Sequence, residues 1–151
     1  MQEQNSAGGM VECMITGVPA GIGEPAFEKL NANLGKAILS IGAVKAFEIG
    51  DGIAVAQSDG LHNNDAYCAD EAGHITKKTN HSGGITGGIS DGCEILFRAA
   101  FKPTPSISAT QESVTRTGEN LDISIKGRHD PIIVPRAVVV VECMTALVIL
   151  D

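Results

Sequence analysis

The chain has few aromatic residues and no broad positive charge, and both absences exclude classes of partner. Tryptophan is absent, tyrosine occurs once, and aromatic residues make up 3% of the 151 positions. Proteins that bind single-stranded nucleic acid stack the bases on aromatic side chains, so no such surface is expected. The formal net charge of -7 argues against a broad face for a polyanion. We therefore expect no nucleic-acid partner.

Signals for secretion, membrane insertion and metal binding are also missing. The first residues are polar, so we expect no signal peptide, and the apolar run 137–150 contains Glu142 and is too short to span a bilayer. The four cysteines form no C-x-x-C pair and no zinc-like spacing with histidine, so no metal site is expected. A reducing, cytoplasmic compartment fits them best. Three lie in apolar runs typical of core thiols: Cys13, Cys93 and Cys143.

Hydrophobic residues make up 43% of the chain, enough for one folded domain over residues 1–151. Both ends are expected to be cuts from a longer protein, because residue 151 directly follows an apolar run without a capping glycine. Apolar and polar residues alternate, as in strands, over residues 11–16, 44–49, 94–101 and 121–125, with a further short strand at 53–56.

Two segments predict long helices. The first opens at Glu24-Pro25 and carries an apolar stripe to about residue 41. In the second, from Pro135 to Leu150, the valines favour a strand but the length favours a helix, which would be buried between layers. Residues 57–80 are polar and are expected to form a long mobile excursion. The predicted fold is α+β, an antiparallel sheet packed on long buried helices.

Three segments have the composition of ligand sites. In Lys102-Pro103-Thr104-Pro105-Ser106 the prolines restrict the backbone, so a lysine and two hydroxyls can converge on an anion; an ordinary turn after a strand is the alternative. The glycine-dense loop 80–90 lets a flat ligand approach the backbone, or is simply a flexible turn. It is neither a P-loop nor a dinucleotide fingerprint.

The third segment is Arg128-His129-Asp130-Pro131. A guanidinium suits a carboxylate or phosphate, and Asp130 beside a cation would stay ionised, as a base must. The alternative is structural: Asp130 caps a turn or helix and pairs with Arg128. The local sequence leaves both interpretations open.

The order and spacing of the motifs resemble the chorismate synthase family. The resemblance covers nearly the whole chain and rests on residues 18–25, 40–45, 48–52, 82–90, 101–106 and 127–131, followed by 135–142. It implies a β-α-β sandwich, of which this chain would hold part, and assembly as a homotetramer. The implied reaction is the elimination of phosphate from 5-enolpyruvylshikimate 3-phosphate to give chorismate, with reduced FMN as cofactor and NADPH only in bifunctional members.

The resemblance also implies roles for single residues. Asp130 corresponds to the catalytic acid that handles the substrate proton. The flavin contacts of the family correspond to Gly42, Ala43, Gly87, Lys102, Pro103, Thr104, Pro105, Ser106 and Arg128.

The chain departs from the family pattern in three places. Gly42 replaces the usual asparagine or proline, and Ile132 replaces a cysteine or small residue. The family's N-terminal half, which carries two catalytic histidines, several substrate-binding arginines and a serine-rich flavin segment, has no counterpart in the 151 residues. Two interpretations follow: part of an active site completed by that half or by further copies, or a non-catalytic fragment that only assembles or binds flavin weakly.

Overall fold

The computed structural model describes residues 4–151, and its centre is a three-stranded antiparallel sheet. Strand β7 (Ile95–Phe101) lies between β1 (Gly9–Ile15) and β2 (Val44–Ile49). It pairs with β1 along its whole length, from Ile95 opposite Ile15 to Phe101 opposite Gly9. The strands predicted at 11–16, 44–49 and 94–101 are confirmed.

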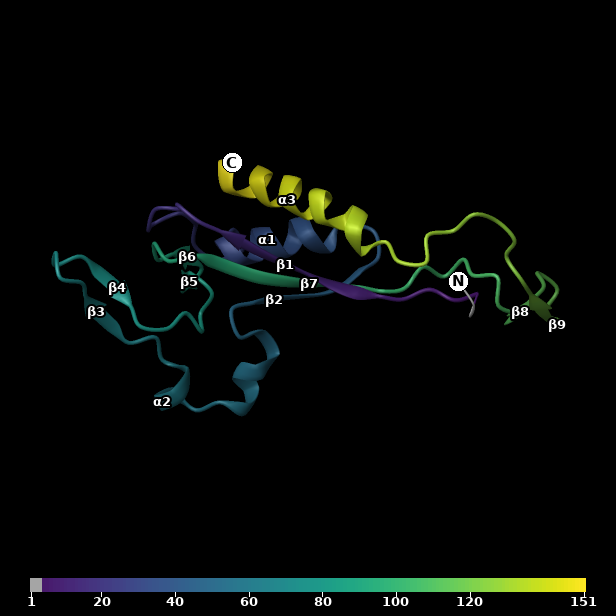
Figure 1. Ribbon diagram of the computed structural model, residues 1–151, viewed down its shortest axis with the longest axis horizontal. Helices are drawn as coiled ribbons and strands as arrows, with labels where there is room; N and C mark the ends of the chain where they lie inside the picture. The colour runs from purple at the N-terminus through teal and green to yellow at the C-terminus, as the bar shows by residue number, and fades with distance from the viewer. Residues whose placement is uncertain (1–3) are drawn as a thin grey trace.

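Helices α1 (Leu30–Leu39) and α3 (Val134–Leu150) lie side by side on one face of this sheet (Figure 1). Alternate residues of a strand point to opposite faces. The buried residues of β7 alternate along the strand and identify the face that the helices cover; they are Ile95, Phe97, Ala99 and Phe101. The predicted α+β arrangement, with two helices on one face of an antiparallel sheet, is therefore confirmed.

The core lies between the sheet and the helices. Phe97, Leu34, Ile38 and Val141 are fully buried, and the ring of Phe97 lies 5.2 Å from that of Phe47 on β2. Such packing of large side chains is the main source of stability in a domain of this size. The opposite face is polar or exposed: Arg98 bridges to Glu12 at 2.7 Å and to Glu48 at 3.4 Å, and Met10 and Met14 are more than half exposed.

The C-terminal run forms a helix, α3, and not a strand, but this helix is not buried between layers. Only Ala137, Val141 and Thr145 are buried, which form one stripe at a spacing of four residues. The other sides of α3 face no element of the described chain, so Leu147 remains 64% exposed. For the same reason the prediction of a core thiol at Cys143 is wrong, because that residue is exposed.

Helix α1 begins later than the sequence predicts. Residues 24–29 form turns, in which Phe27 has a φ of 78° and is 91% exposed. The amide of Leu30 donates to the carbonyl of Gly88 at 2.8 Å. The start of α1 therefore depends on Gly88, which is distant in the sequence. The prediction from Pro25 placed the start too early.

Residues 53–56 form no strand, which corrects the prediction there. They lie in the 3-10 helix η1 (Gly52–Gln57), whose first turn is closed by a bond from the amide of Ala54 to the carbonyl of Asp51. Gly50 and Gly52 have φ values of 56° and 57°, which turn the chain away from the sheet. The apolar run therefore has no neighbouring strand with which to pair.

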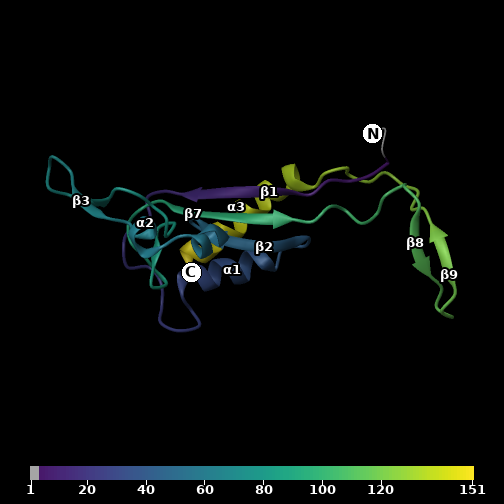
Figure 2. The same cartoon turned by 90° about the horizontal axis from the view of Figure 1, so that it is seen from below.

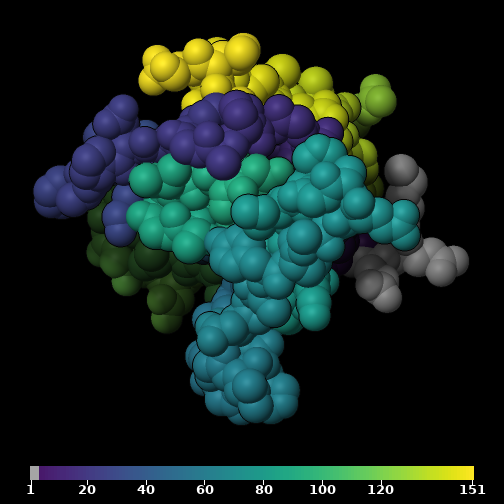
Figure 3. All heavy atoms as spheres, turned by 90° about the vertical axis from the view of Figure 1, so that its left-hand side faces the viewer, coloured from purple at the N-terminus to yellow at the C-terminus, as the bar shows by residue number. Residues whose placement is uncertain are grey.

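Residues 57–80 form the predicted long excursion, and it contains short helical and strand elements. Asp59 caps the short helix α2 (Gly60–Asn63), and β3 (Tyr67–Ala69) pairs with β4 (Ile75–Lys77) in a hairpin. Asp70 fixes the turn between these strands by accepting bonds from the amides of Ala72 and His74. This segment, in teal, projects from the end of the molecule seen in Figure 3.

Two further hairpins complete the described chain. Strands β5 (Ile85–Thr86) and β6 (Ile89–Ser90) form a short hairpin before β7. Strands β8 (Gln111–Val114) and β9 (Asn120–Ile123) form one at the opposite end of the molecule, away from the sheet (Figure 2). The strand predicted at 121–125 is confirmed as β9.

Residues 4–151 contain no helix that is long and apolar enough to cross a membrane. Within the same residues, no group of at least three histidine, cysteine, aspartate or glutamate residues could hold a metal ion.

The core position of Phe97 generates a stability prediction. Phe97→Ala removes the largest fully buried side chain and leaves a cavity between β7 and the helices, which should lower the free energy of unfolding by about 3–5 kcal/mol. Met14→Ala, on the exposed face of β1, is the matched control and should change it by less than about 0.5 kcal/mol. Urea unfolding followed by circular dichroism measures both. Equal effects of the two substitutions would contradict this description of the core.

Candidate active site

Two segments predicted to contact a ligand, 42–43 and 102–106, meet at the end of the sheet where β7 ends. The amide of Lys102 donates to the carbonyl of Ala43 at 2.9 Å, directly beyond the pairing of Val44 with Phe101. Gly42 and Ala43 therefore lie beside the start of the proline-rich segment. Ala43 has a φ of 73°, a conformation that few residues with a side chain adopt.

The N-terminal segment holds the proline-rich segment in place. The hydroxyl of Ser6 donates to the carbonyl of Thr104 at 2.6 Å. Lys102, Pro103 and Pro105 are exposed, while the hydroxyl oxygen of Thr104 is buried and has no hydrogen-bond partner among residues 4–151. A buried hydroxyl without a partner is unfavourable, so Thr104 has bonding capacity for a ligand.

The second cationic motif joins the same region. A cleft of about 830 Å³ is lined by residues 4–7, 106–108 and 127–131. The amide of Ala7 donates to the carbonyl of Pro131 at 2.8 Å, and that of Ala109 to the carbonyl of Gln4 at 3.1 Å. Ser106, Arg128 and Asp130 therefore line one cleft, although about twenty residues separate the two motifs in the sequence.

Asp130 pairs with Arg136, whereas the structural interpretation of the sequence expected a pair with Arg128. Its carboxylate lies 2.8 Å from the guanidinium of Arg136, in the first turn of α3, and not against Arg128. Arg128 is exposed and forms no ion pair within residues 4–151. The cleft thus combines a carboxylate held by one arginine with a second arginine that is free to meet an anion.

Gly87 lies elsewhere. It stands with Gly88 in the turn between β5 and β6, with φ values of 66° and 97° that favour glycine. The bond from Leu30 to Gly88 puts this turn at the N-terminal end of α1, whereas Gly42 follows the C-terminal end. A helix of 10 residues is about 15 Å long, so the structure separates Gly87 from the other residues of the predicted set.

A second cleft, of about 810 Å³, adjoins Gly87. His81 in its lining pairs with Asp51 at 2.6 Å, and Lys29 and Lys77 also contribute to its walls. It therefore combines the exposed Lys29, a histidine held by a carboxylate, and glycine backbone that a ligand can approach.

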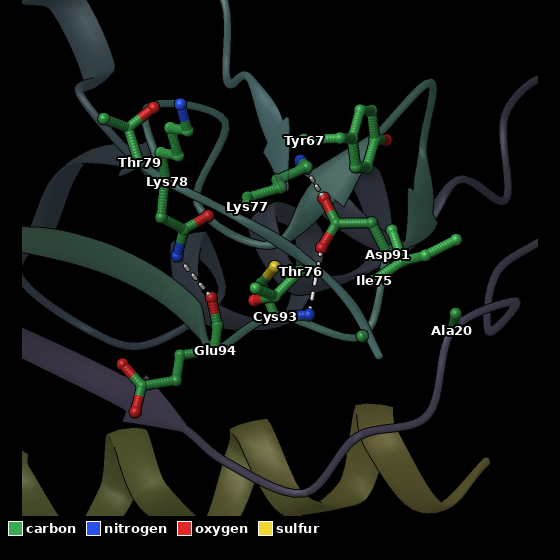
Figure 4. A pocket seen from close by; sticks show the side chains of 12 residues that line it. Ala20, Tyr67, Ile75, Thr76, Lys77, Lys78, Thr79, Asp91, Cys93 and Glu94 are labelled. Carbon is green, nitrogen blue, oxygen red and sulfur yellow. Dashed lines mark hydrogen bonds and ion pairs between the residues drawn. The ribbon is translucent and has the colours of Figure 1, made fainter. Parts of the chain in front are cut away.

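No local sequence pattern indicates the ion cluster beside this cleft. The ammonium of Lys77 lies 2.5 Å from Asp91 and 3.7 Å from Asp65, and its side chain is only 4% exposed. Figure 4 shows Lys77 pointing at Asp91, whose other oxygen accepts the amide of Cys93. Lys77 is followed by the exposed Lys78 in a polar run, so the sequence does not indicate that one of the two is buried.

Hydrogen bonds keep the acids of this cluster ionised. Burial opposes the charge of Asp65, but bonds from Ser82, His81 and Thr79 outweigh it and hold the pKa of Asp65 well below its usual value. Burial likewise opposes the charge of Asp91, while the bond from Lys77 lowers its pKa. Both acids therefore contribute stability at neutral pH, which is lost as pH falls below about 4 and through these lowered pKa values.

The chain is similar to known proteins along its whole length. The model of the family described as chorismate synthase matches residues 1–151. The chain is 66% identical over 147 residues to a chorismate synthase of Lachnoclostridium phytofermentans, covering 97% of this chain and 40% of that protein. It is 62% identical over 151 residues to one of Agathobacter rectalis, covering 100% of this chain and 41% of that protein.

A solved structure agrees with these sequence matches. A crystal structure of chorismate synthase superposes on 98% of this chain and 38% of its own, with a TM-score of 0.77 and 28% identity. The chain thus spans about 40% of the length of the curated relatives that it matches. By family model, sequence identity and fold, the chain belongs to the chorismate synthase family.

Proposed function

We propose that this chain supplies the flavin-binding and proton-handling part of a chorismate synthase active site. The reaction eliminates phosphate from 5-enolpyruvylshikimate 3-phosphate: the bond from carbon to the phosphate oxygen breaks, a proton leaves the ring, and chorismate forms. The observation that carries this proposal is the shared cleft of Ser106, Arg128 and Asp130, next to the proline-rich segment.

The residues at this end of the sheet fit a reduced FMN. Lys102 and Arg128 are exposed cations that suit an anionic cofactor, and the buried hydroxyl of Thr104 lacks a partner that a ligand could supply. Gly42 and Ala43 would offer backbone, with Pro103, Pro105 and Ser106 completing the contact. A reduced FMN held by these residues would supply electron density to the substrate in a reaction that is redox-neutral overall.

Asp130 would accept the proton that the substrate loses. The guanidinium of Arg136 lies 2.8 Å from its carboxylate and holds it at the cleft, where a base must stand. Arg128, which pairs with no acid in the described part of the chain, would meet the negative charge of the substrate or cofactor.

Completion of the site requires further protein. The curated relatives are more than twice as long as this chain, and the resemblance assigns the catalytic histidines and substrate-binding arginines to the part not covered. The chain would therefore act with that portion, in the homotetramer that the family resemblance implies. The exposed apolar sides of α3 support such an assembly, because soluble proteins rarely leave large apolar faces bare. NADPH would enter only if the protein reduces its own flavin.

The proposal predicts that the chain alone has no turnover, because half of the acid–base groups are missing. Anaerobic release of phosphate from 5-enolpyruvylshikimate 3-phosphate with reduced FMN measures this. Addition of the N-terminal portion of the Lachnoclostridium relative should restore release. Release by the isolated chain would contradict this division of the site. No release by the mixture, although the two portions bind each other, would favour a fragment that only assembles.

A second prediction concerns Asp130 in the full-length protein. Asp130→Asn removes the proton acceptor and should lower kcat about 100-fold to 10,000-fold while the affinity for FMN stays within about threefold. Steady-state phosphate release and flavin fluorescence titration measure the two quantities. Asp122→Asn, at an exposed position on β9, is the matched control and should leave both unchanged. Lost flavin binding with normal kcat would rule out the assigned role.

A further inference from the structure

Lys77 is a buried cation whose three ammonium protons all have acceptors. Its ammonium donates to the carboxylate of Asp91 at 2.5 Å, to the hydroxyl of Ser82 at 3.1 Å and to that of Thr86 at 3.3 Å. The side chains of Asp91 and Asp65 are 10% and 6% exposed. A lysine carries three donors, so this environment saturates it. Such a group is fixed in space to a degree that surface lysines are not.

The cluster joins segments that are distant in the chain. Asp65 precedes β3, Lys77 ends β4, and Asp91 follows β6. Asp65 also accepts bonds from the amides of His81 and Ser82 and from the Ser82 hydroxyl, at 2.7–3.0 Å. The glycine-dense turn is thus held by Asp65 where it begins and by Asp91 where it ends.

The turn has little of its own to hold it. Gly83, Gly84, Gly87 and Gly88 all have positive φ, at 63°, 77°, 66° and 97°. Glycine loses more conformational freedom on folding than any other residue, so this segment is costly to order. Strands β5 and β6 have two residues each, and so small a hairpin is not stable by itself. Contacts from other segments must therefore fix it: backbone bonds, such as those of Leu30 to Gly88 and Leu96 to Gly83, and the side chains of the Lys77 cluster.

We propose that Lys77 is a positioning residue, which fixes the turn at Gly87–Gly88 by joining Asp65, Asp91 and the hydroxyls of Ser82 and Thr86. This turn also holds the N-terminal end of α1, through the bond from the amide of Leu30 to the carbonyl of Gly88. It presents the backbone of Gly87 to the second cleft. Recognition of flavin by Gly87 rests on the proposed function, whereas the fixing of the turn does not.

Hydrogen exchange on the chain itself tests the first step. Lys77→Met removes the charge but keeps much of the volume, and amides 83–88 should then exchange at least about tenfold faster, while those of β7 change by less than about twofold. Asp91→Asn breaks the same contact with an isosteric group and should produce a smaller increase, even if Lys77→Met folds poorly. The exposed neighbour gives the matched control, Lys78→Met, which should have no effect. Unchanged exchange at 83–88 in Asp91→Asn, or equal acceleration in β7, would overturn the proposal.

Kinetics of the full-length protein test the second step. If Lys77 positions Gly87 for the cofactor, Lys77→Met should raise KM for reduced FMN at least about tenfold and lower kcat by much less. A change in kcat alone, or no change in KM, would overturn the positioning role. If the unsubstituted full-length protein released no phosphate, the proposed function would fail, and the exchange measurement would still decide whether Lys77 fixes the turn.

Discussion

The pairing of β7 with both β1 and β2 is the constraint on which the rest of the structure depends. Its register places one row of β7 side chains, with Phe97 at its centre, against α1 and α3. The same register determines what happens at each end of the sheet. Where β7 ends, Lys102 bonds to Ala43, and where it begins, Leu96 bonds to Gly50 and Gly83. The two clefts therefore lie beyond opposite ends of one strand pairing.

The candidate site has two parts because the glycine-dense turn and the proline-rich segment lie at opposite ends of this sheet. The end beyond β7 carries Lys102, Arg128, the carboxylate of Asp130 and the Thr104 hydroxyl, which has no partner among residues 4–151. The end before β7 carries Gly87 and the ion cluster of Lys77. A site made from both would need protein that this chain does not contain, which agrees with the share of the relatives that it spans.

The sequence predicts what local pattern controls and misses what distant contacts control. The strands at 44–49 and 94–101 were predicted correctly, because a strand with one buried face places an apolar residue at every second position. The predicted start of α1 was wrong, because the amide of Leu30 bonds to a carbonyl in a distant hairpin. The strand predicted at 53–56 was also wrong, because no strand lies beside these residues and they form a 3-10 helix. Motif order located the cleft of Arg128 and Asp130, but nothing local distinguishes buried Lys77 from exposed Lys78.

We propose that residues 42–43, 102–106 and 128–130 form one flavin-contacting surface. The most direct measurement is an NMR titration with reduced FMN, under anaerobic conditions, of isotope-labelled chain in complex with the N-terminal portion of its Lachnoclostridium relative. We predict saturable shifts of the amides of Ala43, Lys102, Thr104 and Arg128, with β8 and β9 unaffected. Flavin binding that shifts none of these amides would contradict the account.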